Sequence, residues 1–182
     1  MDSLYLRYVN ALLSLAKEEN KVNEYKLALI SLSIYLNDNS DIKKYLESYL
    51  VDKNEKEKIV NVLTKDYKLT YLNNFLLILI KNHRFHDFNK FVNEYKKVAN
   101  IELDILSGNI YSVNYLTKED INKFELSLSN KLHKKVELEN RLDSSLIGGI
   151  KIMINDHIYD GSIKGKIDKM KEQLKERGSL WK

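Results

Sequence analysis

Apolar residues recur at helical spacing through roughly the first hundred positions of this chain. The repeat is interrupted by short polar segments of the kind that connect one helix to the next. These segments lie near Glu19-Asn20, Asn37-Asp38-Asn39, Asp52-Lys53-Asn54, Lys68-Leu69-Thr70 and Asn82-His83. The pattern therefore predicts six helices in the first part of the chain.

From about Glu102 the spacing of apolar residues changes toward two, which is the repeat of a half-buried strand. A helix capped by Thr117 is expected between the first and second strands, and a tight Asn155-Asp156 connection leads into a short return strand through Tyr159. A last helix is expected to begin at Asp160 to Ile163. The candidate strands are Ile110 to Val113, Val136 to Leu138 and Ile150 to Ile154.

These elements predict an α+β fold that is predominantly α. The expected plan is an N-terminal six-helix bundle, residues 1–104, followed by a small C-terminal α/β domain, residues 105–182, with a short sheet and a terminal helix. The boundary is expected near Asp104 to Gly108, with a short junction, since no low-complexity linker is present.

Two of the predicted helices are apolar around most of their circumference. In the first, the polar residues form one narrow stripe, and in the fifth the apolar run Phe75 to Ile80 covers more than a turn. An ordinary surface helix exposes a wider polar arc, so both helices are expected to have neighbours on two sides. A central position in the bundle explains the apolar circumference of the fifth helix. For the first helix, which stands at a chain terminus, contact with a partner protein is the favoured explanation.

Composition excludes several classes of function. The chain has no cysteine, so thiolate catalysis and thiolate metal sites are ruled out. Its net charge of +4 is spread along the chain and does not by itself indicate nucleic acid. The longest apolar run, Phe75 to Ile80, is far shorter than a membrane span, and the N-terminal segment lacks the pattern of a signal or transit peptide.

One cluster has the character of a metal site. His83, His86 and Asp87 would provide two imidazoles and a carboxylate at the start of the predicted sixth helix. Polar capping of that helix explains the same residues more simply, because no further ligand lies nearby in the sequence. No nucleophile-base pattern and no glycine-rich phosphate loop is present, so an enzyme and a cofactor are not expected.

A pair of glycines, Gly148 and Gly149, interrupts an apolar segment just before a predicted strand. Glycine there contributes no packing, so the pair indicates a bulge or a close approach of another backbone segment. We expect the chain to bend beneath the last helix, with Asp160 or Ser162 accepting a hydrogen bond from an amide of that helix's first turn.

Four segments together resemble the delta subunits of F-type ATP synthases, a family that includes the mitochondrial oligomycin-sensitivity-conferring protein. Arg7 to Ala16 resembles the family's N-terminal motif, Asn82-His83-Arg84 its Asn-Gly-Arg, and Ile110 to Thr117 the start of its second domain. The most specific likeness is the C-terminal signature. It comprises Asp143, Leu146, Ile147, Gly148, Gly149, Asp160 and Ser162.

The resemblance implies a non-catalytic stator protein that joins the catalytic head to the peripheral stalk, so that proton-driven rotation is coupled to ATP synthesis. In the family, a groove between the first and fifth helices receives the N-terminal helix of an alpha subunit. The second domain engages the C-terminal helices of the b subunits, with Leu180 and Trp181 as possible anchors. The implied location is peripheral, on the cytoplasmic face of the cell membrane, without direct insertion. Carried over to this chain, the groove residues are Tyr8, Ala11, Leu12, Leu15, Leu76, Leu79 and Ile80.

Two alternatives come from other classes of protein. The lysines and tyrosines could belong to an RNA-binding helical module of a transcription or antitermination complex, with tyrosines stacked on bases. Tyr25, Tyr45 and Tyr95, however, stand at helical spacing beside core positions. An enzyme that uses the His83 cluster would require a tightly bound metal ion.

Overall fold

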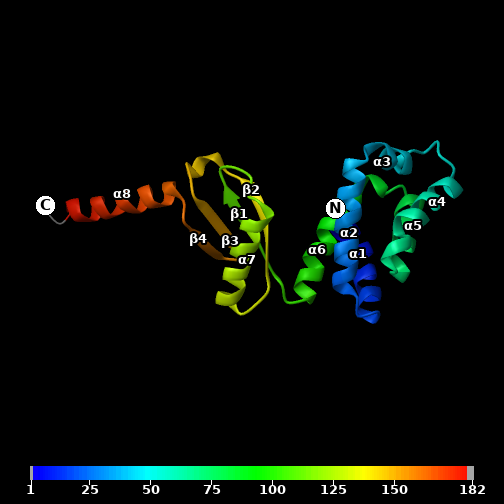
Figure 1. The fold of residues 1–182 in the computed structure, drawn as a ribbon, viewed down its shortest axis with the longest axis horizontal. Coiled ribbons are helices and arrows are strands. Elements are labelled where there is room, and N and C mark those ends of the chain that lie inside the picture. Colours follow the sequence, from blue (N-terminus) through cyan, green and yellow to red (C-terminus); the bar gives the residue numbers. More distant parts are fainter. Residues whose placement is uncertain (1, 180–182) are drawn as a thin grey trace. The chain divides into compact units, whose positions relative to one another are not determined.

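A computed structural model describes residues 2–179, which form eight α-helices and a four-stranded sheet (Figure 1). The chain divides into two compact units, Met1–Leu103 and Asp104–Lys182. The first is helical, and the second combines the sheet with two helices.

The helices of the first unit end where polar residues interrupt the apolar repeat. Three of the connections contain a residue in the left-handed conformation, namely Asn20, Lys68 and His83. A left-handed residue after the last turn commonly ends a helix. The α-helices are α1 (Asp2–Glu18), α2 (Val22–Asp38), α3 (Ser40–Glu47), α4 (Lys53–Thr64), α5 (Thr70–Lys81) and α6 (Phe88–Glu102), and the short 3-10 helices are η1 (Lys65–Tyr67) and η2 (Phe85–Asp87).

Helices α1, α2 and α6 pack against one another, and α5 contacts both α1 and α4. Phe91 of α6 is at the centre, where Tyr5, Tyr8 and Phe75 meet its ring edge to face at centroid distances of 5.0, 5.6 and 6.2 Å. This geometry is favourable for aromatic rings and joins α1, α5 and α6. The arrangement departs from a regular six-helix bundle because α3 is only eight residues long and buries a single residue, Leu46.

A buried tyrosine of α2 connects the segment just after α1 with the start of α5. The Tyr25 hydroxyl of α2 donates a hydrogen bond to Glu19 at 2.8 Å and accepts one from the Tyr71 amide of α5 at 3.0 Å. Burial raises the pKa of Tyr25, so the phenol stays protonated and keeps donating. The connection fixes the start of α5 relative to α1 and α2.

The second unit begins with β1 (Leu106–Ser112), crosses through α7 (Lys118–Leu132) and returns in β2 (Val136–Leu142), parallel to β1. Strands β3 (Ile150–Ile154) and β4 (His157–Asp160) are antiparallel and complete the order β2-β1-β3-β4. The two-residue Asn155-Asp156 connection and the return strand agree with the sequence pattern. The chain passes through η3 (Ser144–Leu146) before β3 and continues into α8 (Ile163–Ser179).

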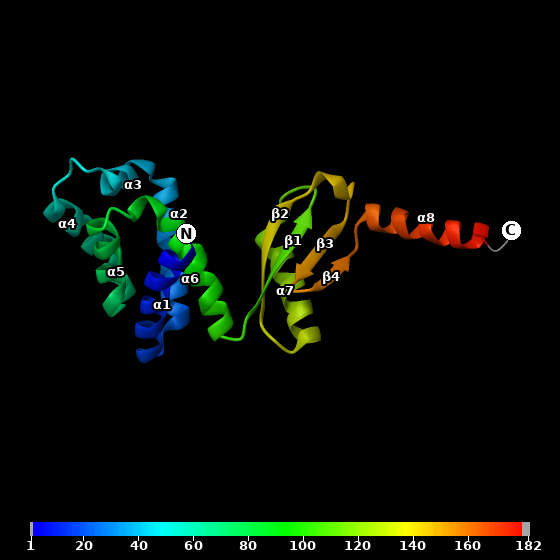
Figure 2. The same cartoon turned by 180° about the vertical axis from the view of Figure 1, so that it is seen from behind.

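Helix α7 covers one face of this sheet, as Figures 1 and 2 show from opposite sides. The core between them is apolar and contains Ile110, Leu128, Val136, Leu138, Ile152 and Ile154. Strand β1 starts at Leu106, earlier than the predicted Ile110, and within it Gly108 fits where a side chain could not. A Cβ on Gly108 would lie 2.6 Å from Ile154 Cγ1. Helix α8 extends away from the sheet instead of packing on it (Figure 2).

Candidate interaction surfaces

The predicted α1/α5 groove residues fall into two groups. Leu12, Leu76, Leu79 and Ile80 are buried in the core of the first unit, where they hold α1 and α5 in place from inside. Ala11 is exposed, and Tyr8 and Leu15 are partly exposed. Beside the polar stripe of α1, the row Leu4, Tyr8, Ala11 and Leu15 is therefore an apolar row that stays at least partly accessible, and it has helical spacing along one face.

The outer face of α5 contributes a residue that the sequence reasoning did not select. Ile78 is 45% exposed, and the flanking positions Asn74 and Lys81 are exposed as well. Their spacing of four and three places them on one solvent-facing stripe, and the two polar residues are the signal that could have identified this face.

Helices α1 and α5 are joined at one end of this surface. The Asn82 side-chain amide, just after α5, donates a hydrogen bond to the Tyr8 hydroxyl at 3.0 Å. Val9, which stands where the family usually has alanine, is fully buried. It therefore points into the core, and its size does not reduce the space between the outer faces of α1 and α5.

The residues of the candidate metal cluster point in different directions. His86 Nε2 lies 3.0 Å from Asp87 Oδ2, and Lys90 Nζ lies 2.7 Å from Asp87 Oδ1, while the ring of His83 packs against Tyr49. Burial acts to raise the pKa of Asp87, but hydrogen bonds from Lys90 and Tyr5 outweigh it and hold that pKa below its usual value. Within residues 2–179 no three His, Cys, Asp or Glu side chains are grouped in a way that could hold a metal ion.

The glycine pair lies where the chain passes under the start of α8. The Ile163 amide donates to the Gly148 carbonyl at 3.0 Å, and a Cβ on Gly148 would lie 2.7 Å from Ile163 Cδ1. Gly149 has a φ of +75°, and a Cβ there would lie 2.5 Å from the Gly161 carbonyl oxygen. Close approach of the Gly161 backbone thus explains Gly149, while Gly148 meets the tip of the Ile163 side chain, and neither requires a ligand.

Hydrogen-bonded side chains organise both ends of this junction. Ser162 Oγ accepts from the Gly165 amide at 3.0 Å, which is the expected cap of α8. Asp160 in turn accepts from the Ser162 amide and hydroxyl at 2.8 and 2.6 Å, and these bonds lower the pKa of Asp160. Asp143 accepts from the Ser145 amide at 2.9 Å and its pKa is lowered in the same way.

Ile147, between Leu146 and the glycine pair, combines two unusual properties. Its φ of +68° is rare for a β-branched residue, and its side chain is 64% exposed while the neighbouring Leu146 is buried. Sequence reasoning assigned the conformational freedom of this turn to the glycines alone. The structure places a residue with positive φ on each side of Gly148.

Helix α8 carries an uncovered apolar stripe. Ile163, Ile167, Met170 and Leu174 repeat at spacings of four, three and four, and they are 46%, 39%, 62% and 68% exposed. Charged residues occupy the remaining face, as in an amphipathic helix that has a partner. Leu180 and Trp181, the predicted anchors beyond this helix, lie outside the described residues.

No helix in residues 2–179 combines the length and the apolar character needed to cross a membrane. Packing accounts for two of the three tyrosines named above for RNA binding, and the third bonds an acidic side chain. Tyr25 and Tyr95 are buried, and the Tyr45 hydroxyl donates to Glu55 at 2.6 Å. Buried rings cannot stack on bases, so the RNA-binding alternative is not supported.

The comparisons with known proteins agree on one family. The family described as "ATP synthase delta (OSCP) subunit" matches residues 5–174. The chain is 34% identical to the ATP synthase subunit delta of Mycoplasma capricolum, covering 95% of this chain and 97% of that protein. It is 37% identical to the subunit delta of Malacoplasma penetrans, covering 90% of each, and 32% identical to that of Clostridioides difficile, covering 93% and 94%.

Among solved structures, the fold is similar to a chain in the cryo-EM structure of the Toxoplasma gondii mitochondrial ATP synthase hexamer. The TM-score is 0.66 at 19% identity, covering 94% of this chain and 97% of that one. With matches to family and relatives that extend over nearly the whole sequence, this chain belongs to the ATP synthase delta (OSCP) subunit family.

Proposed function

We propose that this protein is the non-catalytic stator component of an F-type ATP synthase, which connects the alpha/beta catalytic head to the b-subunit peripheral stalk. Family membership over almost the entire chain supports this role. A structural observation also supports it: each compact unit has a helix with an apolar face that is not covered by the core of that unit. Two such faces on two units suit a connector, because linked sites bind more tightly than either site alone.

The contact with the head is proposed at the outer faces of α1 and α5, where an amphipathic N-terminal helix of the alpha subunit would lie. The six helices of the first unit would act together as its receptor. On α1 Ala11 is exposed and its row neighbours Leu4, Tyr8 and Leu15 are partly exposed, and on α5 Ile78 is exposed. Leu12 and Leu79 support this surface from beneath and do not themselves touch the partner.

The contact with the stalk is proposed at the apolar stripe of α8, where C-terminal helices of the b subunits would pack. A stripe of about three turns, flanked by lysines and acidic residues, fits a partner helix with an apolar seam and charged edges. The protein would be held at the cytoplasmic face of the cell membrane through these partners, without inserting into the bilayer.

Calorimetric titration of the full chain with a peptide of the cognate alpha subunit's N-terminal helix tests the head contact. Saturable binding with a negative heat-capacity change is expected. Ala11→Asp and Ile78→Asp should each weaken it by about tenfold or more, since each places a carboxylate in an apolar contact. Asn10→Asp adds the same charge on the polar side of α1 and should leave the affinity unchanged. Equal affinities for all four proteins would refute the assignment.

A second titration, with a peptide of the cognate b subunit's C-terminal helix, tests the stalk contact. Met170→Asp is expected to weaken this binding about tenfold, because Met170 lies in the middle of the α8 stripe. Gln173→Asp introduces the same charge on the flank of the helix and serves as its control. Each variant should also leave binding of the other peptide intact, which separates the two surfaces.

A further inference from the structure

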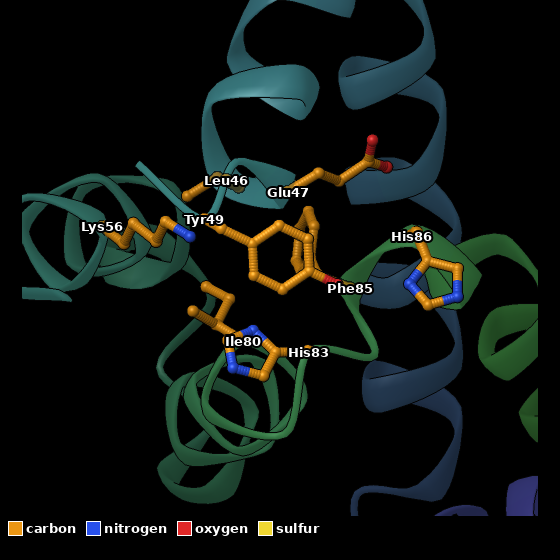
Figure 3. A pocket seen from close by; sticks show the side chains of 8 residues that line it. All are labelled: Leu46, Glu47, Tyr49, Lys56, Ile80, His83, Phe85 and His86. Carbon is orange, nitrogen blue, oxygen red and sulfur yellow. The ribbon is translucent and has the colours of Figure 1, made fainter. Parts of the chain in front are cut away.

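The first unit contains a cavity unrelated to either proposed contact. It lies where α3 and the loop after it face α4, the end of α5 and η2 (Figure 3). Its volume is about 390 Å³, which falls within the range of small-molecule sites. The lining residues are Leu46, Glu47, Tyr49, Lys56, Ile80, His83, Phe85 and His86.

Lys56 is the unusual member of this lining, because it is a charged residue only 6% exposed. Its ammonium donates a hydrogen bond to the Ser48 carbonyl, and among the described residues no carboxylate lies within ion-pair distance of it. The acid one position further along, Glu57, is paired with Lys53. Burial lowers the pKa of Lys56, which reflects the cost of keeping this charge away from water.

An ammonium group has three donors, so Lys56 retains hydrogen-bonding capacity beyond its bond to Ser48. Figure 3 shows its nitrogen directed from α4 toward the ring of Tyr49. A buried cation without a carboxylate partner is stabilised by an anion and repels a metal ion. The position of Lys56 therefore selects for an anionic ligand.

The other polar groups of the cavity are compatible with an anion. The ring of His83 lies against that of Tyr49, with centroids 4.7 Å apart and the planes tilted by 37°. His86 is held by Asp87, and Asp87 is held in turn by Lys90. The acidic member of the lining, Glu47, directs its carboxylate away from Lys56 (Figure 3).

The remaining lining is apolar and aromatic. Leu46, Ile80 and Phe85 are buried and belong to the core of the first unit. Tyr49, at 74% exposure, stands in the loop between α3 and α4 and can lie against a ligand from the solvent side. A ligand that fits this lining has a flat apolar body as well as a charged end.

We propose that this cavity binds a small organic oxyanion, a carboxylate or phosphate ester with a planar apolar body. The Lys56 ammonium bonds the oxyanion, and Tyr49 and Phe85 contact the body. This site is separate from the stator role and does not depend on it, since none of its residues belongs to the exposed rows of α1 or α8.

Nuclear magnetic resonance titration of the full-length, isotope-labelled chain tests the proposal with three probes: phenyl phosphate, benzoate and inorganic phosphate. Saturable shifts confined to residues 46–56 and 80–86 are expected with at least one of the two aromatic probes, and weaker binding with inorganic phosphate. The proposal is overturned if neither aromatic probe gives saturable shifts in these segments. It is also overturned if inorganic phosphate binds there as tightly as the aromatic probes.

Lys56→Gln supplies the decisive variant, and Lys58→Gln its control, because Lys58 is exposed on the same helix and its loss changes the net charge equally. Lys56→Gln should lower the affinity for the bound aromatic probe about tenfold, as expected for loss of a hydrogen bond to a charged group. Lys58→Gln should leave that affinity unchanged. Equal affinities in the two variants overturn the assignment of Lys56.

Tyr49→Ala keeps the test decisive even if Lys56→Gln fails to fold, because Tyr49 is largely exposed in a loop. Removal of the ring should lower the affinity for phenyl phosphate or benzoate about fivefold and leave the affinity for inorganic phosphate unchanged. If the aromatic probes bind this variant as tightly as the original protein, the cavity does not hold them in the proposed way.

Discussion

Helices α1 and α8 are both amphipathic segments of 17 residues, but they are supported in opposite ways. Helix α1 packs against α2, α5 and α6 through buried residues such as Val9 and Leu12, and only a narrow apolar row remains accessible. Helix α8 keeps its apolar stripe exposed, and the amide of its first residue bonds the Gly148 carbonyl just before β3. A similar apolar periodicity thus gives a preformed surface in one unit and a largely unsupported helix in the other.

The difference matters for how each surface is maintained. An isolated helix of about 15 residues is only marginally stable in water, because tertiary packing supplies most helical stability in proteins. The α1 row is held in shape by its core whether or not a partner is present. The conformation of α8 depends on its cap, on the glycine junction beneath it and on the partner that covers its stripe.

The largest effect is expected from disrupting the core that supports the α1 row. Leu79→Asp places a carboxylate at a fully buried position and should destabilise the first unit by about 4 kcal/mol or more. Urea unfolding followed by circular dichroism measures the loss. Ala11→Asp, on the exposed row, should change stability by less than about 0.5 kcal/mol. Comparable losses of unfolding free energy in the two variants would show that the row on α1 is part of the core and not an accessible surface.

Gly149→Ala should damage the α8 junction by about 3 kcal/mol, because Ala is strained at positive φ and its Cβ would collide with the Gly161 carbonyl. Gly161→Ala is the matched control. Its Cβ would meet the Ile150 carbonyl oxygen at 3.4 Å, an ordinary contact. Denaturation of the full chain, with the amide signals of β3 as a local probe, should show a much larger effect at Gly149.

A smaller effect is expected from Ser162→Ala, which removes the α8 cap and should cost about 1 kcal/mol locally. Hydrogen exchange at the Gly165 amide should accelerate, whereas amides of α1 should be unaffected. Ser144→Ala, at an exposed position in η3, provides the reference. Unchanged exchange at Gly165 would mean that α8 does not depend on this cap.

The smallest effect concerns pH. Hydrogen bonds from Ser162 lower the pKa of Asp160 in the folded protein, so its contribution is present above the unfolded pKa and lost as pH falls. We expect the α8 junction to loosen below about pH 4. The chemical shift of the Ser162 amide should report this change. In Asp160→Asn that shift should no longer change with pH in this range. A titration that is identical in the variant would assign the change to another group.

The positions of helix breaks were predictable from the sequence because they depend on local residues. Asn20, Lys68 and His83 stand at polar interruptions of the apolar repeat, and each adopts the left-handed conformation that ends a helix. The hairpin at Asn155 follows the same logic, since asparagine tolerates a positive φ. Local chemistry was sufficient for these features.

Features that depend on packing were harder to predict. The sequence marks Leu12 and Leu79 as apolar, but only the packed helices show that they point inward and that Ile78 points outward. Likewise, Lys56 reads as one more charged residue of α4 until the fold places it beside Tyr49, His83 and Phe85. Periodicity identifies an apolar face, while the three-dimensional arrangement decides which part of it is covered.

The backbone bonds at the base of α8 have a mechanical consequence. The Gly161 amide donates to the Ile150 carbonyl at 2.9 Å, and the Ile163 amide donates to the Gly148 carbonyl at 3.0 Å. Ile150 is the first residue of β3, an interior strand bonded to β1 on one side and β4 on the other, and Gly148 lies two residues before it. Helix α8 is covalently continuous with the edge strand β4, and these two bonds also attach its base to β3 and to the segment before it, so a load on α8 is shared with an interior strand instead of resting on the edge strand alone.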